Sequence, residues 1–489
     1  MSAVRRIETL LPPASDAGVL RCGSAAASRE VFAAWLRAVT QWLTGQGIRP
    51  GDRVAFLAPA GVRQVVSLIA CMRAGAVACP LNPRQPATVN AECIRAAGCT
   101  AGIVWSEEEC AALAGLRRLT FPWSPQDLLD LAAWAPGPNA PTDPSAVSVE
   151  ADAPAVVVFT SGSTGRPRAA VLSAGSLFAN ARASRRNIPL APGDAWLLSL
   201  PLYHVSGLGI VFRCIESGAA MAVPDPDEPL IDAMRRLGAT SLSLVPTQLH
   251  RLLADPEGVR ALRAVKSVLL GGGAIPEDLL REVGRRRLPV ATTYGLTETA
   301  SQVATTALDA HHDGPRRSAP PLIPGTVRLS DDGEVLVSGP CLFLGYLQPD
   351  GSMERPFCPD GWFATGDLGT WEAAGELRIL GRRDFRFVCG GENIQPEEIE
   401  AALLSLSAIQ QAIVVPTPDP EWGERPVAFV RTAAGCAVPT AAALRELLRD
   451  RLPGIKIPQA LLPWPADLDA GGIKPRRSDF AERARRLLG

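Results

Sequence analysis

The sequence predicts an α/β protein with two parts: a large N-terminal domain of parallel sheets and helices, and a small α+β domain at the C-terminus. Three observations support this fold class. The chain has 489 residues, more than one small hydrophobic core accommodates. Helical and strand-like segments alternate along most of it, as in βαβ units with a parallel sheet. After about Gly381 the segments become short and mixed.

The first elements establish the alternation. We expect an amphipathic helix at 28–47, with Ser28 as the N-cap, Glu30 near its first turn and Gly45 at its end. A strand, a helix and a strand follow at 52–59, 62–73 and 76–80. Further apolar strands are expected at 155–160, 196–200, 241–245 and 267–270. A Pro-rich stretch at 135–154 is interpreted as a surface connection, because the alternation resumes directly after it.

The C-terminal tail is interpreted as a separate α+β domain. It contains a helix at 396–404, a strand at 412–415 and a helix at 440–451. The segment GRRD at 381–384 is the expected joint between the two domains.

Composition and charge argue against several classes of protein. The chain has 49 basic and 50 acidic side chains, so no basic excess indicates nucleic acid or an anionic membrane as a partner. Only 4 histidines are present, and none of the 11 cysteines forms a CxxC pair, which favours buried thiols over a metal site. No apolar run indicates a signal peptide or a membrane helix, so a cytoplasmic protein is expected.

The strongest local motif is TSGSTGRPR at 160–168, which follows the apolar run AVVVF. Glycine backbones let several N–H groups converge on an anion, and hydroxyls and a cation add donors. The residues that carry this chemistry are Thr160, Ser161, Gly162, Ser163, Thr164, Gly165 and Arg168. A flexible surface loop would explain the Gly and Ser content but not the preceding strand or the two arginines. The motif lacks the GxxxxGK[ST] pattern of Walker-type NTPases.

Four weaker motifs follow. PLYHVSG at 201–207 holds His204, GGGAIP at 271–276 follows an apolar strand, TYGLTE at 293–298 offers an aromatic face and a carboxylate, and TGD at 365–367 offers a carboxylate for ribose hydroxyls. Taken alone, each has a structural alternative: a core histidine, a plain turn, a helix start and a polar turn.

In this order the motifs resemble the adenylate-forming superfamily of acyl-CoA synthetases, adenylation domains and beetle-luciferase-type enzymes. The resemblance runs from about residue 30 to the end, and it also includes GWFATGDLG, GRRDFRFVCGGENIQPEEIE and GGIKPRR. It implies an adenylation domain at 1–381 with the ATP and acid pocket, a hinge at 382–384 and a mobile domain at 385–489. It also implies MgATP and coenzyme A as cosubstrates: a carboxylic acid forms an acyl-adenylate, and the CoA thiol then takes the acyl group.

The resemblance assigns roles by position. Residues 160–168 would hold the β- and γ-phosphates, Thr297 would contact the α-phosphate, and Glu298 would bind Mg²⁺. Adenine would lie between the backbone of Gly271, Gly272, Gly273 and Ala274 and the segment Tyr294–Gly295. Asp367 and Arg382 would hold ribose, with Asp384 as the hinge. Gly390 and Gly391 would border the pantetheine tunnel, and His204 would lie at the acid pocket.

Two departures from the superfamily pattern stand out. Arg168 replaces the usual lysine and precedes Ala169–Ala170 where glycine is common, but it keeps the charge. The C-terminal motif is GGIK at 471–474 where Gly-Lys-Ile is usual. Either the catalytic lysine is absent, or Lys474, two residues further along the chain than the usual lysine, has taken over its role.

The GGIK motif, together with WLLSLPLYHVSGLGIVFR, resembles the o-succinylbenzoate:CoA ligases of menaquinone biosynthesis. That substrate carries a second carboxylate, for which Arg213 is the candidate receptor. The alternative is a structural arginine at the end of an apolar strand-like run. Ser301 and Gln302 are further pocket candidates, and Thr299 is a weaker one.

Other functions remain open from the sequence. The chain could act on another aryl, medium-chain or fatty acid, or load a carrier protein. A nucleotide-binding protein without ligase activity and a luciferase-like oxygenase are further alternatives. The expected partner is a small-molecule acid, with no nucleic acid and no membrane insertion, and a homodimer is left open.

Overall fold

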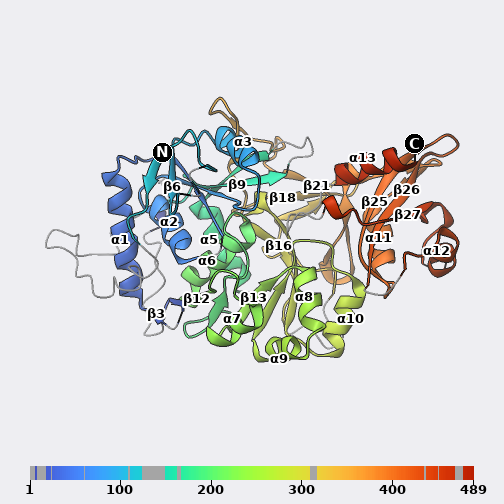
Figure 1. The fold of residues 1–489 in the computed structure, drawn as a ribbon, viewed down its shortest axis with the longest axis horizontal. Helices are drawn as coiled ribbons and strands as arrows, with labels where there is room; N and C mark the ends of the chain where they lie inside the picture. The colour runs from blue at the N-terminus through green and yellow to red at the C-terminus, as the bar shows by residue number, and fades with distance from the viewer. Residues whose placement is uncertain are drawn as a thin grey trace.

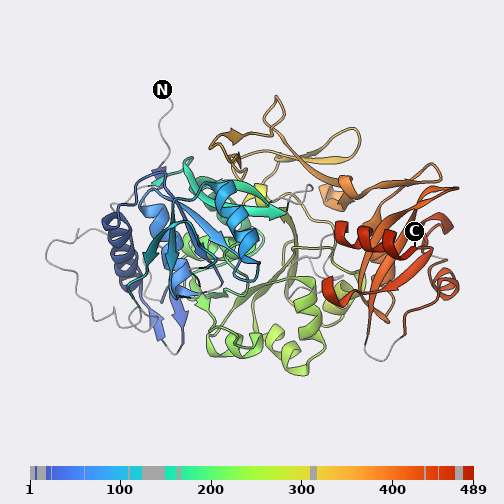
Figure 2. The same cartoon turned by 45° about the horizontal axis from the view of Figure 1, so that its top comes forward.

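The computed structural model describes residues 6–7, 18–23, 25–59, 61–107, 109, 111–123, 149–161, 167–308, 316–433, 437–449, 451–468 and 477–488. The chain forms a large N-terminal body and a smaller C-terminal unit, drawn orange to red at one end of the molecule in Figures 1 and 2. This arrangement confirms the predicted fold class. The described residues contain no helix that is long and apolar enough to cross a membrane.

Two eight-stranded sheets form the body. In the first, β5, β4, β6 and β7 run parallel to β9, while β10 and β19 continue it antiparallel. Its strands, in spatial order, are β20 (Met353–Glu354), β19 (Gly345–Leu347), β10 (Pro167–Ser173), β9 (Pro154–Ser161), β5 (Val77–Leu81), β4 (Arg53–Leu57), β6 (Ala101–Val104) and β7 (Arg117–Thr120).

The second sheet is parallel from β15 to β2, with an antiparallel strand at each edge. Its strands, in spatial order, are β16 (Ser301–Thr305), β15 (Val290–Leu296), β14 (Ser267–Leu270), β13 (Ser241–Leu244), β11 (Ala195–Leu197), β12 (Ala220–Val223), β2 (Leu20–Cys22) and β3 (Ala25–Ala27). A separate pair joins β1 (Arg6–Ile7) to β8 (Val149–Glu150).

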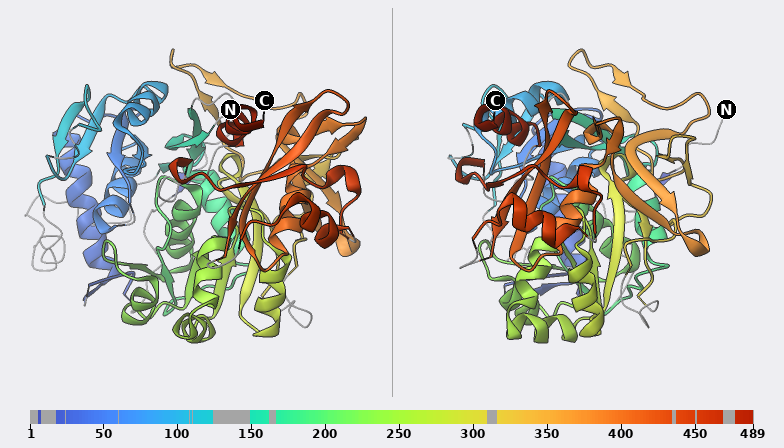
Figure 3. Two further views of the ribbon diagram at one scale, coloured as in Figure 1. Left: turned by 45° about the vertical axis from the view of Figure 1, so that its right-hand side comes forward. Right: turned by 90° about the vertical axis from the view of Figure 1, so that its right-hand side faces the viewer.

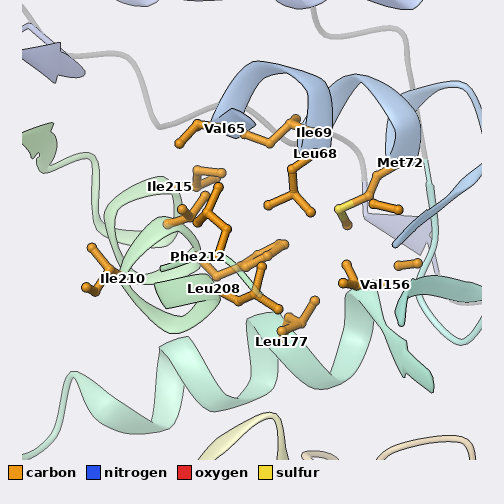
Figure 4. Packing of buried hydrophobic residues seen from close by; sticks show 14 of the residues in the cluster. Val65, Leu68, Ile69, Met72, Val156, Leu177, Leu208, Ile210, Phe212 and Ile215 are labelled. Atoms are coloured by element: carbon orange, nitrogen blue, oxygen red, sulfur yellow. The ribbon is translucent and has the colours of Figure 1, made fainter. Parts of the chain in front are cut away.

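Helices cover both sheets, and their apolar faces form the core. The helices are α1 (Arg29–Gly45), α2 (Val62–Arg73), α3 (Ala87–Ala97), α5 (Ala174–Ser184), α6 (Val205–Ser217), α7 (Leu230–Arg236), α8 (Pro246–Leu253), α9 (Pro256–Ala264) and α10 (Glu277–Arg285). Figure 4 shows Leu68 of α2, Leu177 of α5 and Phe212 of α6 converging in one buried cluster. This packing fixes α6 between the two sheets, which matters for the site because α6 carries His204 at its start and Arg213 within it.

A third, four-stranded sheet links the body to the C-terminal unit. It consists of β17 (Val327–Leu329), β18 (Glu334–Val337), β21 (Phe363–Trp371) and β22 (Leu377–Arg382). The C-terminal unit is turned toward the viewer in Figure 3, and its described residues form one sheet and three helices. Its elements are β23 (Phe387–Cys389), β24 (Glu392–Ile394), α11 (Pro396–Leu404), β25 (Ile409–Asp419), β26 (Gly423–Thr432), α12 (Ala441–Leu448), β27 (Ala460–Pro463) and α13 (Arg477–Leu488).

Apolar burial separates the two parts of the chain. The buried clusters of the C-terminal unit run from Phe387 to Ala484, and those of the body end at Leu377. The segment between them carries the expected hinge. The exact division at 381, 382–384 and 385 stays a prediction.

The predicted elements are confirmed at several points. Ser28 caps α1 by accepting a hydrogen bond from the Val31 backbone N–H at 3.3 Å. Helix α2 has the predicted bounds, and so does α11. Of the cysteines that the structure describes, seven are buried and two are partly buried. Most of the Pro-rich stretch at 135–154 lies outside the described residues.

Three local expectations are wrong. The run that ends at Arg213 is not strand-like: it forms the helix α6, most of whose residues from Gly207 to Ser217 are buried. TGD at 365–367 is not a turn but part of the nine-residue strand β21. TYGLTE is not a helix start, because its first four residues belong to β15 and only Thr297–Thr299 form a 3₁₀ turn.

Candidate active site

The candidate residues gather where neighbouring strands end. Strands β11, β13, β14 and β15 are adjacent and parallel, so their carboxyl ends lie at one edge of the second sheet. That edge carries the segments that begin at Leu198, Val245, Gly271 and Thr297. Ligands in open α/β sheets bind at this edge, in the crevice outside the strand ends.

The phosphate-loop motif begins at the end of β9, with Thr160 and Ser161, and finishes at the start of β10, with Pro167 and Arg168. Strand β9 pairs antiparallel with β10, so that Thr160 is opposite Arg168. The Arg168 guanidinium carbon lies 3.4 Å from the ring centroid of Tyr346, and its Nη2 lies 3.6 Å from Glu354 Oε1. Two partners, Tyr346 and Glu354, thus hold this cation at the base of the loop. The predicted residues Gly162, Ser163, Thr164 and Gly165 lie outside the described residues, as does the side chain of Ser161.

The glycine segment after β14 presents backbone to its surroundings. Gly271 packs so closely that a Cβ there would lie 2.6 Å from Thr293 Cγ2, while Gly273 has open space around its Cα. Gly272 has φ +81°, a left-handed backbone that favours glycine. Gly272, Gly273 and Ala274 are exposed. A flat ligand can therefore approach this backbone without meeting side chains.

One polar cluster joins three segments that are distant in sequence. Tyr294 Oη donates to Asp367 Oδ2 at 2.6 Å, and Arg382 Nη1 donates to Asp367 Oδ1 at 3.2 Å. The pairing of β21 with β22 puts Asp367 opposite Arg382. Burial and the Asp367 carboxylate raise the pKa of the Tyr294 phenol well above its usual value. Burial alone would lower the pKa of Arg382, but Asp367 and Asp384 outweigh it and raise it. The structure thus brings together the predicted ribose and adenine residues.

Glu298 is buried beside that cluster. The Tyr346 hydroxyl donates to Glu298 Oε1, and the Phe343 backbone N–H donates to the Glu298 carbonyl at 2.8 Å. Glu298 is 9% exposed. Burying a carboxylate costs free energy unless the carboxylate is paired or binds a cation. The Glu298 carboxylate fits a hard cation, because carboxylate oxygens are ligands that Mg²⁺ prefers.

The backbone after Glu298 is strained. Ala300 has a backbone φ of +56° and Ser301 one of +141°, values that residues other than glycine rarely adopt. Asn180 of α5 supports this turn: its Nδ2 donates to the carbonyls of Thr299 at 3.1 Å and Gln302 at 2.8 Å. Such strain persists only where the surroundings over-determine it, and it concentrates at functional sites.

His204 stands at the N-terminus of α6. Its ring packs edge-on against Tyr203, with centroids 4.7 Å apart. The imidazole is exposed, but the surrounding protein removes part of its hydration, which lowers its pKa. A neutral imidazole is therefore favoured at neutral pH.

Arg213 of α6 is a cationic side chain buried inside the body. It is only 2% exposed, and its guanidinium carbon lies 4.4 Å from the ring centroid of Trp196. Its Nε and Nη1 have no hydrogen-bond partner in the part of the chain that the structure describes. Burial lowers its pKa to about 10, so the group is still a cation at neutral pH. A buried cation without an anion is costly.

Gly209 and Ser301 stand next to this cation. A Cβ built at Gly209, one helical turn before Arg213, would lie 3.0 Å from Arg213 Nη1 and 3.3 Å from Ser301 Oγ. The structure therefore brings Ser301 and Arg213 to one place, as predicted from the sequence. Gln302 is the next residue of β16 and faces the opposite way. It lines a small recess together with Thr299 and Val337.

The hinge segment is held from both sides. Arg382 Nη2 lies 3.2 Å from Asp384 Oδ2, and Gln395 of the C-terminal unit donates to the Arg382 carbonyl at 2.9 Å. Gly390 lies in the β23–β24 hairpin beneath the indole of Trp422. Gly391 has φ +84°. Lys474 and the GGIK motif lie outside the described residues.

Sequence reasoning missed Tyr346, Trp196 and Asn180. One signal was present: the chain has only 3 tyrosines, and all three, Tyr203, Tyr294 and Tyr346, contact a predicted site residue. Rare aromatic residues that carry a hydroxyl are candidates for polar positions of a site. Nothing in the sequence indicated Asn180, whose partners are backbone groups more than a hundred residues away.

Residues 23–347 match the family model of the AMP-binding enzyme, and residues 398–468 match that of the AMP-binding enzyme C-terminal domain. The chain therefore belongs to the AMP-binding enzyme family, which confirms the resemblance found from its motifs.

Among the relatives, the chain is 35% identical over 472 residues to the 2-succinylbenzoate–CoA ligase of Salmonella typhimurium, covering 95% of this chain and 94% of that protein. Among solved structures, it is similar to a variant of E. coli MenE with bound OSB-AMS, with a TM-score of 0.79, 31% identity and coverage of 97% and 96%.

The o-succinylbenzoate CoA synthetase (MenE) from Bacillus subtilis is also similar. In complex with the acyl-adenylate intermediate OSB-AMP it has a TM-score of 0.79, 27% identity and coverage of 94% and 93%. In complex with ATP and magnesium ion it has a TM-score of 0.78, 27% identity and coverage of 91% and 93%.

Proposed function

We propose that this protein is an ATP-dependent acid:CoA ligase that acts on 2-succinylbenzoate in menaquinone biosynthesis. Oxygen of the succinyl carboxylate attacks the α-phosphorus of ATP, the α–β phosphoanhydride bond breaks, and pyrophosphate leaves. The CoA thiol then attacks the acyl carbon of the acyl-adenylate. A C–S bond forms, the C–O bond to AMP breaks, and AMP leaves. Family membership over most of the chain and the relatives named above support this assignment.

The described residues fit ATP and magnesium by their chemistry. Asp367 is a carboxylate acceptor for ribose hydroxyls, and the exposed backbone at Gly272–Ala274 suits a flat base. The described residues contain no group of three or more His, Cys, Asp or Glu side chains that could hold a metal by themselves. This suits Mg²⁺, which usually binds through one or two carboxylates plus phosphates and water. Glu298 would hold the ion, which would neutralise charge on the phosphates.

The chain's own residues mainly position charge. Adenylyl transfer needs fixed cations and donors more than covalent chemistry by the protein. Arg168 would meet the terminal phosphates at the base of the loop, and Thr297 would donate to the α-phosphate. Lys474 would bridge the substrate carboxylate and the α-phosphate in the first half-reaction. His204, with its lowered pKa, would lie beside the acid near the path of the thiol.

One observation carries the choice of substrate: the buried guanidinium of Arg213, whose Nε and Nη1 have no hydrogen-bond partner among the described residues. A monoacid would leave this cation without an anion once its single carboxylate is activated. The aryl carboxylate of 2-succinylbenzoate would supply one, with Ser301 Oγ as an added donor next to it. Charge-assisted hydrogen bonds of this kind are about twice as strong as neutral ones.

The second half-reaction would involve the C-terminal unit. We propose that residues 382–384 act as the hinge and that Gly390 and Gly391 border the pantetheine of CoA. Both glycines have positive φ, +55° and +84°, and Gly391, which has open space around it, would give the narrow thiol chain close access to the backbone. A cytoplasmic location is a further prediction about this protein, and a homodimer stays open. Neither depends on the site.

The test is pyrophosphate release with MgATP, CoA and a panel of acids that includes 2-succinylbenzoate, benzoate, a succinate half-ester and a medium-chain fatty acid. We expect CoA-dependent turnover with 2-succinylbenzoate and formation of its CoA thioester, identified by mass spectrometry. Faster turnover of a simple aryl or fatty acid would retain the ligase class and reject this substrate. Turnover with a carrier protein but not CoA would favour the carrier-loading alternative.

A further inference from the structure

Tyr346 contacts both the cation of the phosphate loop and the carboxylate proposed for magnesium. Its hydroxyl donates to Glu298 Oε1, and the Arg168 guanidinium carbon lies 3.4 Å from its ring centroid. A guanidinium within about 6 Å of an aromatic centroid is attracted by the ring face. One phenol therefore joins two groups that sequence analysis treated as separate parts of the site.

The strand register fixes this arrangement. Tyr346 on β19 is opposite Ala170 on β10, and Glu354 on β20 is opposite Tyr346. Arg168 is two residues before Ala170, so its side chain lies on the same face as that of Tyr346. The three side chains form a row across adjacent strands, with the Arg168–Glu354 ion pair spanning it.

Packing prevents the phenol from moving away. Tyr346 is 4% exposed, and its ring packs edge-on against Phe343, with centroids 4.8 Å apart. The Phe343 backbone N–H donates to the Glu298 carbonyl at 2.8 Å. The same short segment of chain thus holds the Glu298 backbone and, through Tyr346, its carboxylate.

We propose that Tyr346 is a positioning residue for the metal-bound triphosphate. It occupies one lone-pair position of Glu298 Oε1, which orients the carboxylate and leaves other lone pairs for a divalent cation. Its ring holds Arg168 at a fixed separation from that carboxylate. Groups that orient a metal ligand typically change metal affinity by about 10- to 100-fold when they are removed. This inference rests on the proposed function, because it requires a nucleotide–metal complex at Glu298.

The two contacts can be separated by substitution. Tyr346→Phe keeps the ring over Arg168 and removes only the hydroxyl, so we expect Mn²⁺ affinity to fall about 10- to 100-fold. Tyr346→Leu also removes the ring, and we expect an added rise in the KM for ATP. In an Arg168→Ala background this added rise should disappear, because the cation that the ring positions is gone.

The measurement is Mn²⁺ binding by electron paramagnetic resonance in the presence of a non-hydrolysable ATP analogue, with the analogue alone titrated by calorimetry. For Tyr346→Phe we expect weaker Mn²⁺ binding, unchanged binding of the analogue without metal, and recovery of turnover at high Mg²⁺. Tyr203→Phe is the matched control, since it removes the same atom from a tyrosine that packs on His204, and its Mn²⁺ affinity should match wild type.

Unchanged Mn²⁺ affinity in Tyr346→Phe would overturn the inference, as would a loss of turnover that high Mg²⁺ does not restore. A failure of the proposed function looks different. In that case the wild-type protein releases no pyrophosphate with any acid, whereas its Mn²⁺–nucleotide binding still reports on Tyr346. A wild-type protein that binds no Mn²⁺ with the analogue would overturn both.

Discussion

Arg213 lies with its guanidinium carbon 4.4 Å from the ring centroid of Trp196, enclosed by protein, and among the residues that the structure describes no acidic side chain pairs with it. Such an arrangement costs stability in the free protein. A residue that lowers the stability of the folded protein is usually found where function requires it. The function proposed for Arg213 is to bind a second carboxylate on the substrate.

Arg213→Met should separate stability from substrate recognition. Replacing a buried charge by an apolar side chain of similar length is often neutral or stabilising, so we expect an unchanged or higher midpoint of thermal unfolding. The KM for 2-succinylbenzoate should rise about 10- to 100-fold, the equivalent of a lost charged hydrogen bond, while the KM for a monoacid changes little.

Arg182→Ala is the matched control for that variant. Arg182 is exposed and pairs with Glu216 at 2.9 Å, and exposed pairs contribute little. Equal effects of Arg213→Met on the diacid and the monoacid would remove Arg213 from the acid pocket.

Gly209→Ala probes the same place from the backbone. The new Cβ would meet Arg213 Nη1 and Ser301 Oγ at 3.0 and 3.3 Å, in the space proposed for the aryl carboxylate. Alanine favours the helix by about 1 kcal/mol, so stability should hold while the KM for the diacid rises in steady-state kinetics. Gly45→Ala, at the end of α1 with open space around it, should leave that KM unchanged. A variant that unfolds at lower temperature and binds the diacid normally would argue against an anion site here.

Asp367→Asn tests the nucleotide pocket. The side chain would lose its charge-assisted hydrogen bonds with Tyr294 and Arg382 and its strong acceptor for ribose. Hydrogen bonds to charged groups contribute about 1.5–3 kcal/mol, which corresponds to roughly a 10- to 100-fold rise in the KM for ATP. Asp332→Asn, which removes an exposed carboxylate paired with Arg383 at 3.2 Å, is the control. A normal KM for ATP in Asp367→Asn would place the ribose elsewhere.

Lys474→Ala tests whether this lysine replaces the usual catalytic one. We expect acyl-adenylate formation to be crippled, because no cation would bridge the carboxylate and the α-phosphate. Thioester formation from supplied acyl-adenylate should remain largely intact in single-turnover assays. Lys456→Ala, which breaks a pair with Glu398 on the C-terminal unit, should leave both half-reactions intact. If Lys474→Ala also leaves both intact, the lysine has no such role.

Elements with local signals could be predicted from the sequence. Ser28 is an N-cap residue that indicates the start of α1, and Pro396 is the first residue of α11, a position that proline favours. Helix α6 was missed because Gly207 and Gly209 are poor helix formers in isolation. In the fold Gly207 is required: a Cβ there would lie 2.1 Å from the Pro201 carbonyl oxygen. Tertiary packing outweighed intrinsic preference there.

The residues of the candidate site also had local signals in the sequence, but the contacts between them did not. Motifs gave Arg168, Glu298, Tyr294 and Asp367, because each lies in a run of characteristic residues. The contacts that join them could not be predicted. Tyr346 reaches Glu298 across 48 residues, and Tyr294 reaches Asp367 across 73, and no short-range pattern encodes these distances.

The most direct test of the central claim follows one oxygen atom. The protein would turn over 2-succinylbenzoate labelled with ¹⁸O in the succinyl carboxylate, together with MgATP and CoA, and mass spectrometry would locate the label. We expect one labelled oxygen in AMP and the other in the CoA thioester, because the carboxylate oxygen that attacks the α-phosphorus leaves with AMP. Label in pyrophosphate or phosphate, or AMP without label, would contradict an acyl-adenylate pathway.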